Sequence, residues 1–165
     1  MSVGEGKLLD VIIVGTGPAG FAASLAAHEQ GLRYRALEQD CLGGTVARYP
    51  RAKLVLTAPV ELPMIGRVTL RETSREALLE LWQRAENETG VEIRYGERVE
   101  DIRSVEGGFE VRSTSGAHHS KAVVLAIGRR GSPRKLGVEG EDKSKVVYQI
   151  EDPADYAHRL SLIHI

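Results

Sequence analysis

The 165-residue sequence contains a single cysteine, Cys41. One cysteine excludes an intramolecular disulfide framework and any C-x-x-C redox or zinc motif within these residues, and such usage is typical of a reducing cytoplasm. The sequence also lacks an excess of charge, since 22 basic and 23 acidic residues leave a formal net charge of -1. A balanced chain offers no overall field to a nucleic acid, an anionic membrane or a polyanionic substrate, so we expect a small-molecule partner.

Long hydrophobic runs are also missing at the start of the chain. The first seven residues are mostly polar or small, and the apolar run that follows is interrupted by Asp10. Neither a secretory signal peptide nor a transmembrane span is predicted from this pattern. We expect a soluble, cytoplasmic protein with neither a nucleic acid nor a membrane among its partners.

The order of the periodic segments predicts an α/β fold. Residues 11–14 form a continuous β-branched run, which is typical of a central strand of a parallel sheet that is buried on both faces. Pro18 opens a segment with an apolar stripe that stops at Gly31, and residues 33–37 alternate as a second strand. This order of strand, helix and strand is one βαβ unit.

Later segments extend this sheet and interrupt it. The capping-box pattern Thr73-x-x-Glu76 opens a second helix that Gly90 closes, and residues 91–94 follow as a third parallel strand. Short alternating runs then predict an inserted three-stranded antiparallel β-meander, before a buried parallel strand at 123–127; the runs are 98–105, 108–113 and 118–122. Residues 41–66 have turn signals but no period, so we expect an irregular excursion with a short strand at 53–56.

A glycine motif stands where the first predicted strand meets the first helix. It reads Gly15-Thr16-Gly17-Pro18-Ala19-Gly20, a G-x-G-x-x-G in which glycines permit the tight turn, the approach of a pyrophosphate and close helix packing. Glu38 follows about 20 residues later, at the end of the second strand, where a carboxylate accepts hydrogen bonds from both hydroxyls of an adenosine ribose. The two features predict a dinucleotide site that rejects a ribose 2′-phosphate, and they leave NAD and FAD both open.

Other candidate residues have a structural interpretation that we prefer. Trp82 is expected to pack in the core rather than stack on a ligand, and Cys41 to pack rather than react. The pair His118-His119 points to opposite faces of a strand, so a surface turn is favoured over a metal site. A basic run is interpreted as a solvated loop, with a phosphate or acidic-carrier site as the alternative; its residues are Arg129, Arg130, Arg134 and Lys135. We assign no catalytic and no metal-ligating residue.

Two further segments resemble the pyridine-nucleotide disulfide oxidoreductase superfamily. They are Cys41-Leu42-Gly43-Gly44-Thr45 and the signature at residues 122–133, which has Ile127 where the family usually has threonine. Tyr49-Pro50 and residues 136–141 are similar to the thioredoxin-reductase-like branch that includes bacillithiol-disulfide reductases. The resemblance implies a Rossmann-like FAD-binding domain with a parallel sheet and an inserted meander, of which this chain is a truncated, N-terminal part.

The resemblance also implies a role for individual residues. The residues implied to bind the FAD pyrophosphate are Gly15, Gly17, Pro18, Ala19 and Gly20. Those implied to bind the adenosine end are Glu38, Gln39 and the backbone of Val99. Those implied to bind the flavin end are Gly44, Thr45 and Tyr49, with Ala126 and Gly128 beside the isoalloxazine. The paired redox cysteines that follow the Gly-Gly-Thr segment in some members are replaced by Val46-Ala47-Arg48-Tyr49. A disulfide relay is therefore not expected in this segment.

We divide the chain accordingly. Residues 1–130 are expected to be the N-terminal part of an FAD-binding domain, and 131–159 a connection toward an NAD(P)H-binding domain that these residues do not contain. Residues 160–165 match the translation of a DNA-sequencing adapter and are expected to be a non-native tail, with an ordinary apolar strand as the alternative.

The function expected of the full-length parent is that of an NAD(P)H-dependent FAD oxidoreductase. It would pass a hydride from the nicotinamide to the flavin, and the electrons onward to a disulfide or another acceptor, either a small molecule or a small redox protein. The parent is expected to be a homodimer. Two alternatives stay open, an inactive FAD-binding fragment without turnover and a single-site NAD-dependent dehydrogenase.

Overall fold

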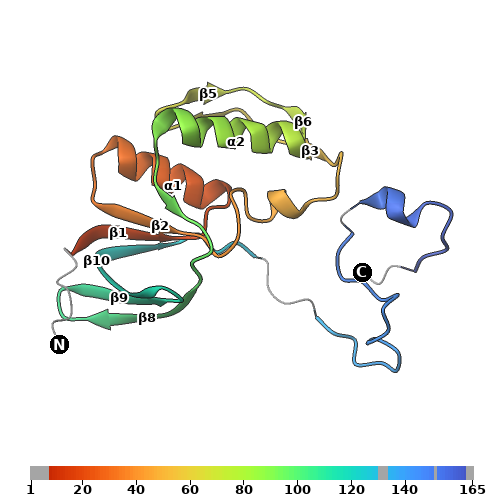
Figure 1. Ribbon diagram of the computed structural model, residues 1–165. Helices are drawn as coiled ribbons and strands as arrows, with labels where there is room; N and C mark the ends of the chain where they lie inside the picture. The colour runs from red at the N-terminus through yellow and green to blue at the C-terminus, as the bar shows by residue number, and fades with distance from the viewer. Residues whose placement is uncertain (1–7, 130–133, 151, 163–165) are drawn as a thin grey trace.

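The computed structural model describes residues 8–129, 134–150 and 152–162. Residues 8–129 form a three-layer arrangement, and the later residues lie apart from these layers (Figure 1). Helices α1 (Pro18–Glu29) and α2 (Arg75–Thr89) cover one face of a six-stranded sheet. The antiparallel end of the same sheet curls under its opposite face. The strand order is β7 (Ile93–Arg94), β2 (Tyr34–Leu37), β1 (Leu9–Val14), β10 (Gly116–Leu125), β9 (Gly108–Ser113) and β8 (Val99–Val105). The predicted α/β fold with an inserted meander is confirmed.

Strand β1 is the centre of the parallel part of the sheet. It pairs in parallel with β2 on one side and with β10 on the other, and β7 adds in parallel to β2. Ile13 packs with Ala27 and Ala36 on the helical side, whereas Ile12 packs with Val111 on the meander side. Both isoleucines are fully buried, which explains the uninterrupted β-branched run, because both faces of this strand are covered.

Strand β10 combines two strands that the sequence analysis separates. Its first half pairs antiparallel with β9 from Gly116 to Ser120, and its second half pairs in parallel with β1 from Ser120 to Leu125. The separation was wrong because residues 118–127 contain neither glycine nor proline to interrupt the strand. The expected burial was also wrong at the end of this segment, where Leu125 is 62% and Ile127 65% exposed.

Helix α2 begins one residue later than the capping box predicts. Thr73 pairs with Val55 in a small antiparallel sheet, and the hydroxyl of Ser74 instead accepts a hydrogen bond from the N–H of Ala77 at 3.1 Å. Gly90 ends the helix in the left-handed conformation, as predicted. Trp82 is buried in the core between the two helices, so its predicted packing role is confirmed.

The segment between β2 and α2 is more regular than predicted. Besides the expected short strand, β3 (Leu54–Leu56), it contains a hairpin of β4 (Val60–Leu62) and β5 (Gly66–Val68). Strand β6 (Glu72–Ser74) pairs with β3. A single 3₁₀ turn, η1 (Val46–Arg48), precedes them. Each short strand pairs with another strand of the segment between β2 and α2.

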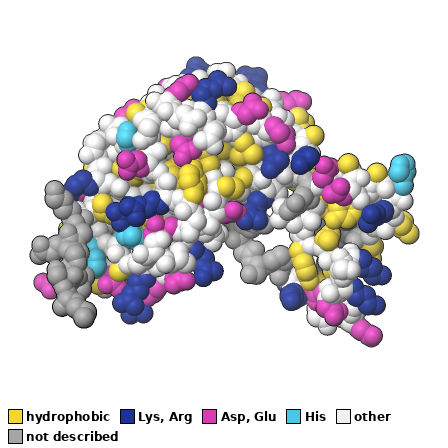
Figure 2. Space-filling model, in the orientation of Figure 1, with side chains coloured by type: hydrophobic (Ala, Val, Ile, Leu, Met, Phe, Trp, Pro, Cys, Tyr) yellow, Lys and Arg dark blue, Asp and Glu magenta, His cyan; other side chains and the backbone are white. Residues whose placement is uncertain are grey.

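The described C-terminal residues contribute no strand to the sheet and contain one 3₁₀ turn, η2 (Pro153–Tyr156). Contacts join them to η1 and the loop after it: Gln149 Nε2 donates to the carbonyl of Arg48 at 3.2 Å, and Arg51 Nη1 lies 3.6 Å from Asp152 Oδ2. Apolar side chains are exposed along this part of the chain (Figure 2), and they include Leu136, Val138, Val147, Tyr148, Leu160 and Leu162. Within the part of the chain that the structure describes, neither α1 nor α2 has the length and hydrophobicity to cross a membrane.

Candidate dinucleotide site

Two glycines of the motif are required by the packing of the chain itself. Gly15 has a φ of +92°, and a Cβ built on it would lie 2.7 Å from the carbonyl oxygen of Ala126. A Cβ on Gly20 would lie 1.8 Å from the carbonyl oxygen of Gly15. The turn therefore brings together the end of β1, the start of α1 and the segment after β10.

The middle glycine of the motif is not required in this way. Gly17 precedes α1 with a φ of −63°, which any residue adopts, and a Cβ built on it would meet nothing within 4 Å. No side chain caps α1, and Pro18 and Ala19 in its first turn are exposed. The first N–H groups of a helix lack intrahelical acceptors, so the space over Gly17 is suited to an anionic group such as a pyrophosphate.

Glu38 lies beside this turn and is almost fully buried, with 6% of its surface exposed. Its Oε2 accepts hydrogen bonds from the backbone N–H of Thr16 at 2.7 Å and from the Thr16 hydroxyl at 3.1 Å. Its Oε1 accepts one from the N–H of Asp40 at 2.9 Å. No role is predicted for Thr16 from the sequence; a hydroxyl residue between the first two glycines is the signal that could have identified it.

The Gly43-Gly44 segment crosses over the glycine turn. The N–H of Gly43 donates to the carbonyl of Thr16 at 3.0 Å. A Cβ on Gly44 would lie 3.2 Å from Cα of Gly17, and one on Gly43 would lie 2.7 Å from Leu79 Cδ2. Packing against α2 thus explains the first glycine of the pair, and the close approach to the motif explains the second.

The predicted flavin-end residues beyond this pair have different surroundings. Thr45 is exposed at the start of η1. Tyr49 is half-buried against the helical core, with the Lys53 ammonium 5.5 Å from the centre of its ring. These contacts are those of a side chain that packs against the core.

Four more predicted residues lie around the carboxyl ends of the parallel strands. Gln39 is exposed next to Glu38, and Ala126 donates its N–H to the carbonyl of Val14 at 2.8 Å. Val99 opens β8 and packs on the meander side of β1. Gly128 is exposed with a φ of +67°. The last residues of the signature, 131–133, lie outside the described residues, as does Arg130 of the basic run.

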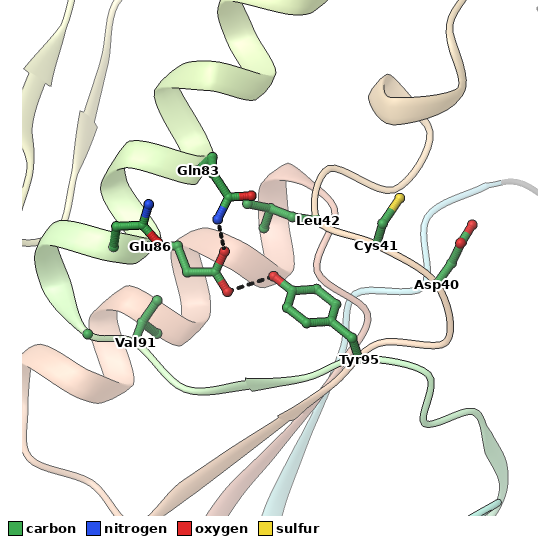
Figure 3. Close-up of a pocket in the computed structure, with 9 residues that line it drawn as sticks. Asp40, Cys41, Leu42, Gln83, Glu86, Val91 and Tyr95 are labelled. Atoms are coloured by element: carbon green, nitrogen blue, oxygen red, sulfur yellow. Dashed lines mark hydrogen bonds between the residues drawn. The ribbon is translucent and has the colours of Figure 1, made fainter.

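A pocket of about 520 Å³ opens between α2 and the loop after Glu38 (Figure 3). Gln83 and Glu86 point from α2 toward Tyr95, whose hydroxyl donates to Glu86 at 2.8 Å. Burial, followed by this bond to the Glu86 carboxylate, raises the pKa of Tyr95. Asp40 lines the pocket, but none of the residues predicted to bind the cofactor does.

Behind Glu38 lies a buried polar network that the sequence analysis missed. His118 Nε2 lies 2.5 Å from Glu97 Oε1, and Arg35 Nη1 lies 2.6 Å from His118 Nδ1. The hydroxyl of Ser113 also donates to Glu97, at 2.5 Å. The expected surface turn at His118 is wrong, because this side chain faces inward from β10 and is 9% exposed.

Burial acts to raise the pKa of Glu97, but the bonds from Ser113 and His118 outweigh it and leave the pKa below the ordinary value. Burial lowers the pKa of Arg35. The network is tied to the candidate site through the backbone, since the N–H of Glu97 donates to the carbonyl of Glu38 at 2.9 Å.

Cys41 is exposed, so the expectation that it fills a packing position is wrong. Partial burial and the nearby carboxylates of Asp40 and Glu38 raise the pKa of its thiol. A raised pKa lowers the thiolate fraction at neutral pH, which is opposite to the environment of a reactive cysteine.

The chain matches a known protein family whose members are oxidoreductases. The family model described as pyridine nucleotide-disulphide oxidoreductase matches residues 12–163, which is most of the chain. The chain belongs to this family. Curated relatives in it include a ferredoxin--NADP reductase of Streptococcus thermophilus, 28% identical over 96% of this chain and 47% of its own. The reductase of the same name from Streptococcus pyogenes is 32% identical over 82% of this chain and 40% of its own.

Solved structures of the family share the fold. A bacillithiol disulfide reductase from Bacillus cereus superposes with a TM-score of 0.80 at 24% identity, over 91% of this chain and 49% of its own. A thioredoxin reductase of T. acidophilum gives a TM-score of 0.60 at 28% identity, over 82% of this chain and 40% of its own. The chain spans about half the length of these oxidoreductases.

Proposed function

We propose that this chain binds FAD and forms the FAD-binding part of an NAD(P)H-dependent oxidoreductase. The observation that carries the proposal is the open space over Gly17, at the uncapped start of α1 and beside the Glu38 carboxylate. A dinucleotide needs a phosphate site and a ribose acceptor close together. Membership of the family favours FAD over NAD as the occupant.

Each predicted residue has a role in this proposal. Gly15, Gly17, Pro18, Ala19 and Gly20 surround the pyrophosphate, since they form the turn and the first turn of α1. Glu38 and Gln39 hold the adenosine end, with the backbone of Val99. Gly44 and Thr45 face the flavin end with Tyr49, and Ala126 and Gly128 let the chain pass beside the ring system.

Bound FAD supplies the redox chemistry, accepting a hydride from NAD(P)H and releasing electrons to an acceptor. The residues of this chain bind and orient it. Similar proteins are named for two kinds of acceptor, ferredoxin and bacillithiol disulfide. With Cys41 as its one cysteine, the chain cannot itself supply a redox pair for the disulfide reaction.

We propose the same division of the chain as before. Residues 1–130 form the FAD-binding part, 131–159 lead toward a nicotinamide-binding domain, and 160–165 are a non-native tail. The described residues of 131–159 add no strand to the FAD-binding sheet, which supports a connecting role. We further propose a cytoplasmic homodimer for the parent protein.

A second candidate is FAD binding without turnover. The sequence contains a single G-x-G-x-x-G, followed by one ribose carboxylate, so this chain has one recognisable dinucleotide site. Oxidation of NAD(P)H by FAD needs a binding site for each nucleotide, so one site supports FAD binding without turnover.

The absorption spectrum of the purified chain tests these proposals. We expect a yellow protein whose fluorescence titration with FAD shows one site, and which binds FAD more tightly than NAD. Protein that binds NAD but not FAD contradicts the flavin site and supports the single-site dehydrogenase. Anaerobic addition of NADH or NADPH then separates the remaining candidates: bleaching of the flavin supports turnover by this chain, whereas unbleached yellow protein supports FAD binding without turnover.

A further inference from the structure

We propose that Thr16 is a positioning residue that orients the Glu38 carboxylate so that it reads a single hydroxyl of the bound adenosine ribose. The inference rests on the proposed dinucleotide function and concerns a residue that the motif itself leaves unspecified, since Thr16 is the first variable position of G-x-G-x-x-G. The juxtaposition that carries it is that of the Thr16 hydroxyl and Glu38 Oε2.

Thr16 has no exposed surface, and its polar groups all bond within the site. Its N–H and its hydroxyl both donate to Glu38 Oε2, at 2.7 and 3.1 Å. Its carbonyl accepts from the N–H of Gly43 at 3.0 Å. Thr16 therefore joins the glycine turn, the acidic end of β2 and the Gly43-Gly44 crossing into one hydrogen-bonded unit.

The number of free acceptor positions on the Glu38 carboxylate decides how many hydrogen bonds it can accept from the ribose. An ionised carboxylate has about four acceptor positions, two on each oxygen. The two donors of Thr16 occupy both positions on Oε2, and the N–H of Asp40 occupies one on Oε1. One position on Oε1 remains, so one of the two neighbouring ribose hydroxyls donates to Glu38 with full strength and the other does not.

The hydroxyl of Thr16 makes this selection. Replacing it by a methyl group, as in Thr16→Val, keeps the shape of the side chain but removes one donor from Oε2. The valine methyl group fills the space of the hydroxyl, so Oε2 stays closed to the ligand there, but the Glu38 carboxylate is held by one bond fewer and can rotate to meet either ribose hydroxyl. The variant is expected to bind FAD less tightly, because a less organised acceptor loses more freedom on binding, and to distinguish the two hydroxyls less well.

Three probes test this: FAD, and two analogues whose adenosine ribose lacks either the 2′- or the 3′-hydroxyl. Dissociation constants are measured by flavin fluorescence for the wild-type chain, Thr16→Val and Thr16→Ser. In the wild type, we expect loss of one hydroxyl to weaken binding roughly tenfold or more and loss of the other by less than about threefold. In Thr16→Val the two analogues should bind within about threefold of each other, whereas Thr16→Ser, which keeps the donor, should behave as the wild type.

A purely structural role of Thr16 would weaken all three probes equally and leave the ratio between the two analogues unchanged, which would overturn the inference. Equal losses for both analogues in the wild type would overturn it without any variant, even where Thr16→Val does not fold. Failure of the wild-type chain to bind FAD at all would overturn the proposed function, and this inference with it. Selective binding by the wild type that persists unchanged in Thr16→Val overturns the role of Thr16 alone.

Discussion

Gly44 lies over Gly17 so closely that a Cβ on Gly44 would stand 3.2 Å from the Cα of Gly17. These residues come from different segments, one at the start of α1 and one in the loop after β2. The approach is closer than most Cβ contacts allow, and Gly44 also has a φ of +53°. The loop and the glycine turn therefore form the walls of one site only while residue 44 has no side chain.

Substituting Gly44→Ala should weaken FAD binding more than it weakens the fold. The added methyl group pushes the loop away from Gly17, and the left-handed conformation costs about 1 kcal/mol of stability for an alanine. We expect at least a tenfold rise in the dissociation constant of FAD. Gly31→Ala is the matched control, because Gly31 has a φ of +65° with open space around it and lies at the far end of α1. Gly31→Ala should be destabilised against denaturant as much as Gly44→Ala but should retain its affinity for FAD. Equal FAD affinities in the two variants would contradict a role for the approach of Gly44 to Gly17.

Gly17→Ala and Gly20→Ala should separate binding from folding within one motif. A Cβ on Gly17 meets nothing within 4 Å and the backbone is extended, so the free energy of unfolding should change by less than about 0.5 kcal/mol. The same methyl group occupies the space assigned to the pyrophosphate, so FAD binding should fall to an undetectable level. In Gly20→Ala the Cβ would lie 1.8 Å from a backbone oxygen, and the protein should be severely destabilised. Chemical denaturation and FAD titration of both variants check this pair, and tight FAD binding by Gly17→Ala would refute the phosphate site.

The parts of the fold that depend on local pattern were predictable from the sequence. The β-branched run of β1, the glycine turn and the start of α1 follow from residue types at fixed spacing, and the structure brings Glu38 beside that turn. The end of α2 at Gly90 was predictable for the same reason, because a left-handed residue without a side chain stops a helix.

What was not predictable depends on partners far away in the chain. Thr73 matches a capping box, but its pairing with Val55 places it in a strand instead. His118 looks like half of a surface pair, yet Arg35 and Glu97 reach it from other strands and bury it. Spacing places Glu38 near a ribose but cannot show that Thr16 and Asp40 already use part of its carboxylate.

Cys41 should react slowly with alkylating reagents although it is exposed. Partial burial and the carboxylates of Asp40 and Glu38 raise the pKa of its thiol, so less thiolate is present at a given pH than in an unperturbed cysteine. We expect the rate with iodoacetamide at pH 8 to be lower than that of a cysteine peptide and its midpoint to lie at higher pH. Cys41→Ser should leave FAD binding unchanged, since the thiol makes no hydrogen bond to a proposed cofactor residue among the described residues; a loss of FAD would show that the thiol takes part in binding.

Glu97→Gln should destabilise the protein in a pH-dependent manner. The carboxylate accepts bonds from Ser113 and His118 in a buried position, and a neutral amide replaces these charge-assisted bonds at a cost of about 2 kcal/mol at pH 7. The folded-state pKa of Glu97 lies below the ordinary value of 4.5, so its contribution is present above that pH and is lost as the pH falls through the folded value. The difference in unfolding free energy between wild type and variant should therefore shrink below about pH 4.5. Glu100→Gln, three residues further along the chain and exposed beside Arg98, is the control and should change stability by less than about 0.5 kcal/mol at every pH. A Glu97→Gln variant whose deficit persists undiminished at pH 3 would show that side-chain packing, rather than the carboxylate charge, holds this end of the meander against the candidate site.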